Sequence, residues 1–173
     1  MHMLYHLSET GTCAIVEFPG VLYRGGAEKK IREYLIKNNF VDTVIQLPAN
    51  LFFGVGIATC IIVIKKNKKD NNILFVDASE EYEKKGDKNK LEDKNQNRIV
   101  NAYQERKEEQ YFTKLVSNDE VLANGANLSV SSYVEKEDKR EVIDIVKLNE
   151  EIQTLQAEIF TLNTEIANKI ASL

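Results

Sequence analysis

The run ATCIIVI at residues 58–64 constrains the fold most strongly, because it is almost wholly apolar and has the length of one strand. A strand that lacks alternating polar residues is buried on both faces, as in a sheet covered by helices. The run is far too short to span a bilayer, and the chain is predicted to have no membrane association. These properties indicate an α/β domain with this strand in its core.

Alternating strand and helix patterns surround this run. Residues 12–18, 43–47 and 73–78 are predicted strands, and residues 27–40 form a predicted amphipathic helix. The strand–helix–strand order implies a parallel crossover between the first two strands. About ten residues without a helical pattern precede residues 58–64, and so short a connection favours an antiparallel partner. The prediction is a mixed sheet fragment with two parallel strands and one antiparallel strand.

The character of the chain changes after residue 79, and four parts are predicted. Residues 1–79 form the α/β part, and residues 80–97 form a flexible excursion because eleven of these eighteen residues are charged. Residues 98–140 contain a helix, expected over 97–112, and an extended segment, expected over 127–134. Residues 141–173 form a C-terminal helical arm.

Apolar residues of the arm recur at steps of three and four, which is typical of a heptad seam. The seam consists of Leu148, Ile152, Leu155, Ile159, Leu162, Ile166, Ile170 and Leu173. A lone helix of this length is marginal in water, so the seam needs a partner. That partner is either the chain's own domain or another helix in a coiled coil or bundle, and the narrow seam favours the second.

Gly54-Val55-Gly56 has the spacing of a nucleotide-binding loop but not its context. A dinucleotide fingerprint needs a strand before it and a helix after it, whose N-terminus binds phosphate. Here the glycines lead into a predicted strand. Backbone freedom at the entry to that strand explains them better.

Few residues suggest catalysis. Two histidines near the N-terminus leave no Ser-His-Asp arrangement, and no metal-ligand spacing links Cys13 or Cys60 to a histidine. Both cysteines lie in apolar runs, which predicts buried free thiols in a reducing, cytoplasmic compartment. The net charge of −4 argues against nucleic-acid binding by bulk electrostatics, although a local basic patch remains open.

The residues of three segments together resemble a known family. Residues 11–66, which read GTCAIVEFPGVLYRGGAEKKIREYLIKNNFVDTVIQLPANLFFGVGIATCIIVIKK, resemble the modification (M) subunit of type I restriction-modification systems. The resemblance continues through ILFVDAS and through residues 97–134. Such subunits are S-adenosylmethionine-dependent DNA adenine-N6 methyltransferases. The resemblance implies a class I, Rossmann-like methyltransferase sheet. Its fifth, sixth and antiparallel seventh strands would be residues 12–18, 43–47 and 58–64.

Two motifs of that family are missing from these 173 residues. No S-adenosylmethionine loop is present, and Pro19 and Pro48 are the only prolines, so no Asn-Pro-Pro-Tyr/Phe motif exists. The resemblance therefore implies the C-terminal part of such a subunit, inactive alone and unable to bind the cofactor by itself. The alternative is a non-catalytic assembly module. An uncovered fifth-strand edge also predicts self-association.

The resemblance also implies roles for individual residues. Phe52, five residues before Ile57, is expected to stack on a flipped adenine in the complete enzyme; Phe53 is the second candidate, and both could be core residues. Possible DNA-phosphate contacts, or a solvated helix start, are Arg24, Lys29, Lys30 and Arg32. The heptad seam is expected to bind the specificity (S) subunit, with two M subunits flanking one S subunit on DNA.

Overall fold

The computed structural model describes residues 1–137 and 144–171. The chain forms two compact units, Met1–Glu137 and Asp138–Leu173, and each is described by itself. Leu173, the last residue of the predicted seam, lies outside the described residues.

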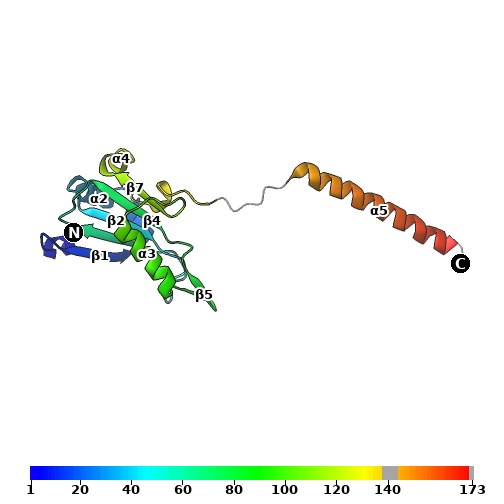
Figure 1. The fold of residues 1–173 in the computed structure, drawn as a ribbon, viewed down its shortest axis with the longest axis horizontal. Helices are drawn as coiled ribbons and strands as arrows, with labels where there is room; N and C mark the ends of the chain where they lie inside the picture. Colours follow the sequence, from blue (N-terminus) through cyan, green and yellow to red (C-terminus); the bar gives the residue numbers. More distant parts are fainter. Residues whose placement is uncertain (138–143, 172–173) are drawn as a thin grey trace. The chain divides into compact units, whose positions relative to one another are not determined.

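A five-stranded sheet is the centre of the first unit (Figure 1). Its strands, in spatial order, are β1 (Thr12–Glu17), β3 (Cys60–Lys65), β2 (Val41–Gln46), β4 (Asn72–Asp77) and β7 (Thr113–Ser117). β3 is antiparallel to both β1 and β2, and β2 is parallel to β4. β7 closes the far side antiparallel to β4. The predicted mixed sheet is confirmed, and β3 lies between the two strands that the crossover joins.

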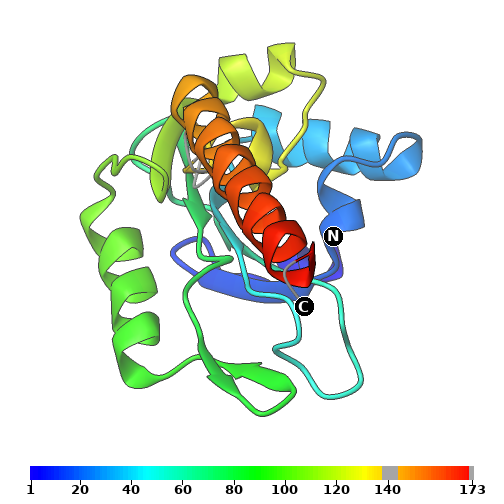
Figure 2. The same ribbon diagram turned by 90° about the vertical axis from the view of Figure 1, so that its right-hand side faces the viewer.

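Both faces of the central strands are buried, because successive side chains of a strand point to opposite faces. Val44 of β2 and Phe75 of β4 belong to one core, whereas Ile45 and Val76 belong to the other. The first core contains side chains from α1 (His2–His6), α2 (Ala27–Lys37), α4 (Asn118–Ala123), and the 3-10 turns η1 (Pro19–Leu22) and η2 (Val130–Ser132). The second lies under α3 (Asp93–Glu105) on the other face (Figure 2).

The segment 80–97 was predicted to be a flexible excursion but contains regular structure. β5 (Glu83–Lys85) and β6 (Lys88–Lys90) form a hairpin, and α3 starts at Asp93. Gly86, with a φ of 61°, allows the tight turn between these strands. Glu92 and Asn95 form a capping box that starts the helix before Asn97. A high density of charged residues therefore did not exclude regular secondary structure in this segment.

Two further segments differ from expectation. The helix predicted over 97–112 ends at Glu105, because Arg106 adopts a left-handed conformation with φ 51°, and the chain then enters β7. Residues 127–134 are not extended but include η2, and the Tyr133 ring stacks on Phe75 at 4.3 Å between ring centroids. Alternating polarity there reflects a turn that packs on the sheet.

Over residues 144–171, the described part of the second unit, the chain forms the helix α5 (Ile145–Ala171). The seven seam residues from Leu148 to Ile170 are all exposed in it. The helix therefore carries an apolar seam that no described residue of its own unit covers.

β1 forms one edge of the sheet, and its outer side has no neighbouring strand among the described residues. Val16 near its end is about half exposed. This strand accordingly alternates between exposed and half-buried side chains, unlike the buried β2.

Candidate functional site

The carboxyl ends of the parallel strands β1, β2 and β4 meet at one end of the sheet. Glu17 and Gln46, the last residues of β1 and β2, both pair with Cys60, and Gln46 also pairs with Asp77. Ligands of open α/β sheets bind outside such carboxyl ends. Residues 47–59, which join β2 to β3, leave the sheet at this end. We call them the base loop, because they contain Phe52, which is expected to stack on a flipped base.

Hydrogen bonds close the foot of the base loop. The Leu47 amide donates to the Thr59 carbonyl at 2.8 Å, and the Gln46 side-chain amide donates to the same oxygen at 3.1 Å. At the tip, the Val55 amide donates to the Phe52 carbonyl at 3.1 Å, and Gly54 has a φ of 72°. A residue with a Cβ would be strained at Gly54, so this glycine serves the turn, as predicted.

The tip of the base loop presents aromatic side chains to solvent. Phe52 is 39% exposed and Phe53 is 98% exposed, whereas Leu51 packs against the second core. Neither phenylalanine is a core residue, which removes the alternative raised from the sequence. The turn thus places two aromatic rings beside the carboxyl ends of the strands.

The β5–β6 hairpin is attached to the base loop by Asn89. Its amide donates to the Asn50 carbonyl at 3.1 Å, and its side-chain Nδ2 donates to the Ala49 carbonyl at 2.8 Å. Figure 2 shows hairpin and loop at the same end of the sheet. Sequence reasoning missed Asn89. The Gly86-Asp87 dipeptide between two short polar runs was the signal that could have indicated a hairpin.

The four basic residues near Gly25-Gly26 do not form one group. Arg32 is buried and donates to the carbonyls of Ala126, Val21 and Arg24 at 2.7, 2.9 and 2.8 Å. Burial lowers the pKa of its guanidinium. Each of its three side-chain nitrogens donates inside the fold and the side chain is buried, so Arg32 is not available for the predicted phosphate contact.

The other three basic residues lie at the surface. Lys29 lies 3.9 Å from Glu33 within α2, and Arg24, which precedes the helix, lies 3.9 Å from Glu28 in its first turn; both pairs have i,i+4 spacing. Lys30 is exposed. Exposed pairs of this kind are weak and can exchange partners.

A cluster of charges around the buried Asp42 carboxylate lies at the opposite end of the sheet. The Asp42 carboxylate is 3.2 Å from both Arg106 and Lys65. Lys68 donates to the carbonyls of Val41 and Asn72, and burial lowers the pKa of its amine to about 8. These contacts join β2, β3, β4 and the end of α3, and we assign the cluster a structural role.

Comparison with known proteins identifies the family. The family model described as N-6 DNA Methylase matches residues 1–142. The chain belongs to the N-6 DNA methylase family. The whole chain is 43% identical to the type I restriction enzyme MpnII methylase subunit of Mycoplasma pneumoniae and covers 32% of that protein. It is 36% identical, over 83% of its length, to the MjaVIII methylase subunit of Methanocaldococcus jannaschii and covers 26% of it.

A solved structure agrees with these relatives. The type I restriction-modification methyltransferase subunit from Streptococcus thermophilus matches with a TM-score of 0.75 and 41% identity, over 78% of this chain and 29% of that one. The chain thus spans about a quarter to a third of the length of these N-6 DNA methylase relatives.

The residues present do not fit the methyl donor that N-6 DNA methylases generally use. Gly54 and Gly56 precede a strand, and Gly25-Gly26 follow the 3-10 turn η1 rather than a strand. About twenty residues after Gly26, where the dinucleotide fingerprint has an acid, this chain has Gln46. No cofactor loop of this kind lies within the described residues.

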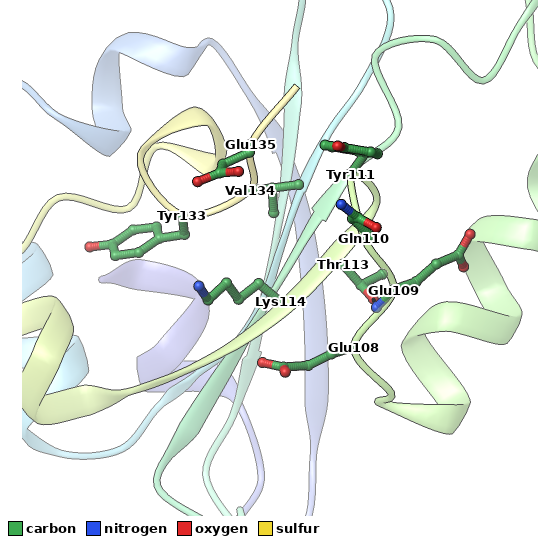
Figure 3. A pocket seen from close by; sticks show the side chains of 9 residues that line it. All are labelled: Glu108, Glu109, Gln110, Tyr111, Thr113, Lys114, Tyr133, Val134 and Glu135. Atoms are coloured by element: carbon green, nitrogen blue, oxygen red, sulfur yellow. Dashed lines mark hydrogen bonds between the residues drawn. The ribbon is translucent and has the colours of Figure 1, made fainter. Parts of the chain in front are cut away.

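The cavity in Figure 3 lies beside β7 and has a volume of about 290 Å³. Its lining includes Thr113, Lys114 and Tyr133. The Thr113 hydroxyl donates to the Lys107 carbonyl at 2.6 Å, and the Tyr133 hydroxyl donates to the Asn127 carbonyl at 2.6 Å. Because both hydroxyls serve the fold, the base loop remains the better candidate site.

The described parts of the chain contain neither a candidate metal site nor a candidate membrane-spanning helix. Within residues 1–137 and 144–171, no group of three or more His, Cys, Asp or Glu side chains could hold a metal ion. No helix within the same ranges has the length and apolar content to cross a membrane.

Proposed function

We propose that this chain supplies the C-terminal part of an S-adenosylmethionine-dependent DNA adenine-N6 methyltransferase subunit of a type I restriction-modification system. The exposed Phe52 on a hydrogen-bonded turn, at the carboxyl ends of the strands, supports this function most directly. An enzyme that modifies a base must take it out of the duplex and hold it by stacking. In the complete enzyme, Phe52 is the residue that stacks on the flipped adenine.

The parts of the enzyme that bind the cofactor and carry the catalytic Asn-Pro-Pro-Tyr/Phe motif are not among these 173 residues. These residues alone therefore do not methylate DNA or bind S-adenosylmethionine. Calorimetry with S-adenosylmethionine tests this part of the proposal, and tight binding by the chain alone would contradict it. Arg24, Lys29 and Lys30 remain proposed contacts to DNA phosphates.

Substitution of Phe52 in an intact subunit that contains this segment tests the stacking role. Base–aromatic stacking is worth about 1–3 kcal/mol, so Phe52→Ala should weaken binding of a duplex with a mismatched target adenine by about 5- to 150-fold. Fluorescence anisotropy measures the binding, and transfer of labelled methyl groups measures activity. Because Phe52 is partly exposed, the fold should tolerate the change.

Phe53→Ala is the matched control, because it removes the same ring from the next residue. We expect a smaller loss from this variant than from Phe52→Ala. A larger loss would transfer the stacking role to Phe53. Wild-type binding and methylation in both variants would refute base stacking by this loop.

A second candidate function is assembly, which the uncovered seam of α5 favours. In this proposal, the seam packs against a helical segment of the specificity subunit. The function does not depend on the missing catalytic motif, so the chain could serve assembly without being an enzyme.

A further inference from the structure

The β5–β6 hairpin and the base loop form one hydrogen-bonded unit although they are far apart in sequence. In the hairpin, Lys85 pairs with Lys88 across the turn, and Lys84 pairs with Asn89. The amide of Asn89 donates away from β5, to the Asn50 carbonyl of the base loop. The outer edge of β6 is therefore fixed against the loop that carries Phe52.

The hairpin is locally basic within an acidic chain. Residues 83–90 contain four lysines and two acids, whereas the whole chain has a formal charge of −4. Lys84 and Asn89, as directly opposed residues, share one face of the hairpin, and the Asn89 side chain bonds to the base loop at Ala49. Lys84 therefore lies on the same hairpin face as Asn89, whereas Lys88, one residue before Asn89, lies on the opposite face.

Two ion pairs connect the hairpin to the start of α3 and leave other lysines available. Lys85 lies 2.9 Å from Glu92, and Lys94 of the helix pairs with Glu83. Lys84, Lys88 and Lys90 form no ion pair with any residue that the structure describes. Lys84 and Lys90 are exposed, and Lys88 is partly exposed.

We propose that this hairpin is a phosphate-contacting element, in which Lys84 from one face and Lys88 from the other bind the DNA backbone next to the adenine held by the base loop. The inference rests on the proposed function and adds a contact surface to it. A flipped base leaves its own phosphates close to the pocket, so cations beside the aromatic loop meet the backbone there. Lysine binds phosphate as a point charge, which positions the DNA but reads no sequence.

The salt dependence of DNA binding tests this assignment. The assembled methyltransferase is prepared with Lys84→Gln and Lys88→Gln together, and binding to its target duplex is measured by anisotropy across a salt series. Each lost phosphate contact reduces the slope of log K against log salt by about 0.9, so the slope should fall by about 1.8. The matched control, Lys37→Gln with Lys69→Gln, removes the same charge at exposed positions of the opposite end and should keep the wild-type slope.

A second measurement does not depend on variants folding. Acetylation of the wild-type complex by an amine-reactive ester, read by mass spectrometry, should be slowed by DNA at Lys84 and Lys88 but not at Lys37 and Lys69. An unchanged slope and equal acetylation with and without DNA would overturn the inference alone. Loss of specificity-subunit association in the hairpin variant, with an unchanged slope, would instead assign the hairpin to a protein contact. A wild-type complex that fails to bind DNA would overturn the proposed function and this inference together.

Discussion

Arg32 joins three segments of the first unit through backbone carbonyls. Its guanidinium donates to Val21 and Arg24, which precede its own helix, and to Ala126 after α4. A buried carbonyl that loses its donor costs about 1–3 kcal/mol, so one side chain stabilises the packing of α2 against the segment that follows α4.

Arg32→Met should therefore lower the free energy of unfolding by about 3 kcal/mol or more, because up to three carbonyls lose a charged donor. Lys30→Met, two residues away and exposed, should change it by no more than about 0.5 kcal/mol. Chemical denaturation measures both. Equal stability of the two variants would show that Arg32 does not have this structural role.

At the scale of elements, α5 and the strands β2, β3 and β4 differ in what supports them. The strands are buried on both faces by α2, α3 and α4. The seam of α5 is exposed within its own unit, and isolated helices owe little stability to propensity alone. A partner helix would supply the missing burial.

Substitution of Ile159→Asp and Leu162→Asp should abolish binding to the specificity subunit, because two charges would enter the apolar seam. The α/β unit should keep its circular dichroism and thermal unfolding transition. Gln153→Asp with Thr164→Asp, which places two acids on the opposite face of the helix, is the control and should bind normally. Co-purification with the tagged specificity subunit measures association, and intact association of the seam variant would contradict the proposal.

The sequence predicted the elements whose patterns are local. The apolar run around Cys60 and Ile64 indicated β3, and the helical spacing around Leu35 indicated α2. The short connection between β2 and β3 indicated that these two strands are antiparallel. It did not predict β7, whose residues Thr113–Ser117 form a strand because β4 provides a long-range partner. The buried state of Arg32 was equally hidden, because its three acceptors are backbone atoms that any residue type could supply. The same limit applies to Asn89 and the base loop.

At the scale of the whole molecule, and among the residues that the structure describes, β1 has an unpaired edge and α5 an uncovered seam, each within its own unit. Unpaired edges and apolar seams both favour association with other chains. We expect the 173-residue chain, studied alone, to self-associate.

Light scattering at high concentration should give a mass of at least twice that of one chain. The Ile159→Asp and Leu162→Asp variant separates the two surfaces: a monomer assigns self-association to α5, whereas a persistent oligomer assigns it to the edge of β1. A clean wild-type monomer at high concentration would contradict the expectation.

The strand order also determines when the first unit can complete its fold during synthesis. Thr12 at the start of β1 pairs with Lys65, and Asn72 of β4 pairs with Ser117. β1 and the outer side of β4 cannot pair until a distant segment has left the ribosome, so the nascent sheet remains incomplete until residue 117 emerges. The residues of α5 follow all of these strands along the chain. Every strand of the sheet is thus translated before the helix that we propose for assembly, so a chain that can associate through α5 already contains the whole sheet sequence.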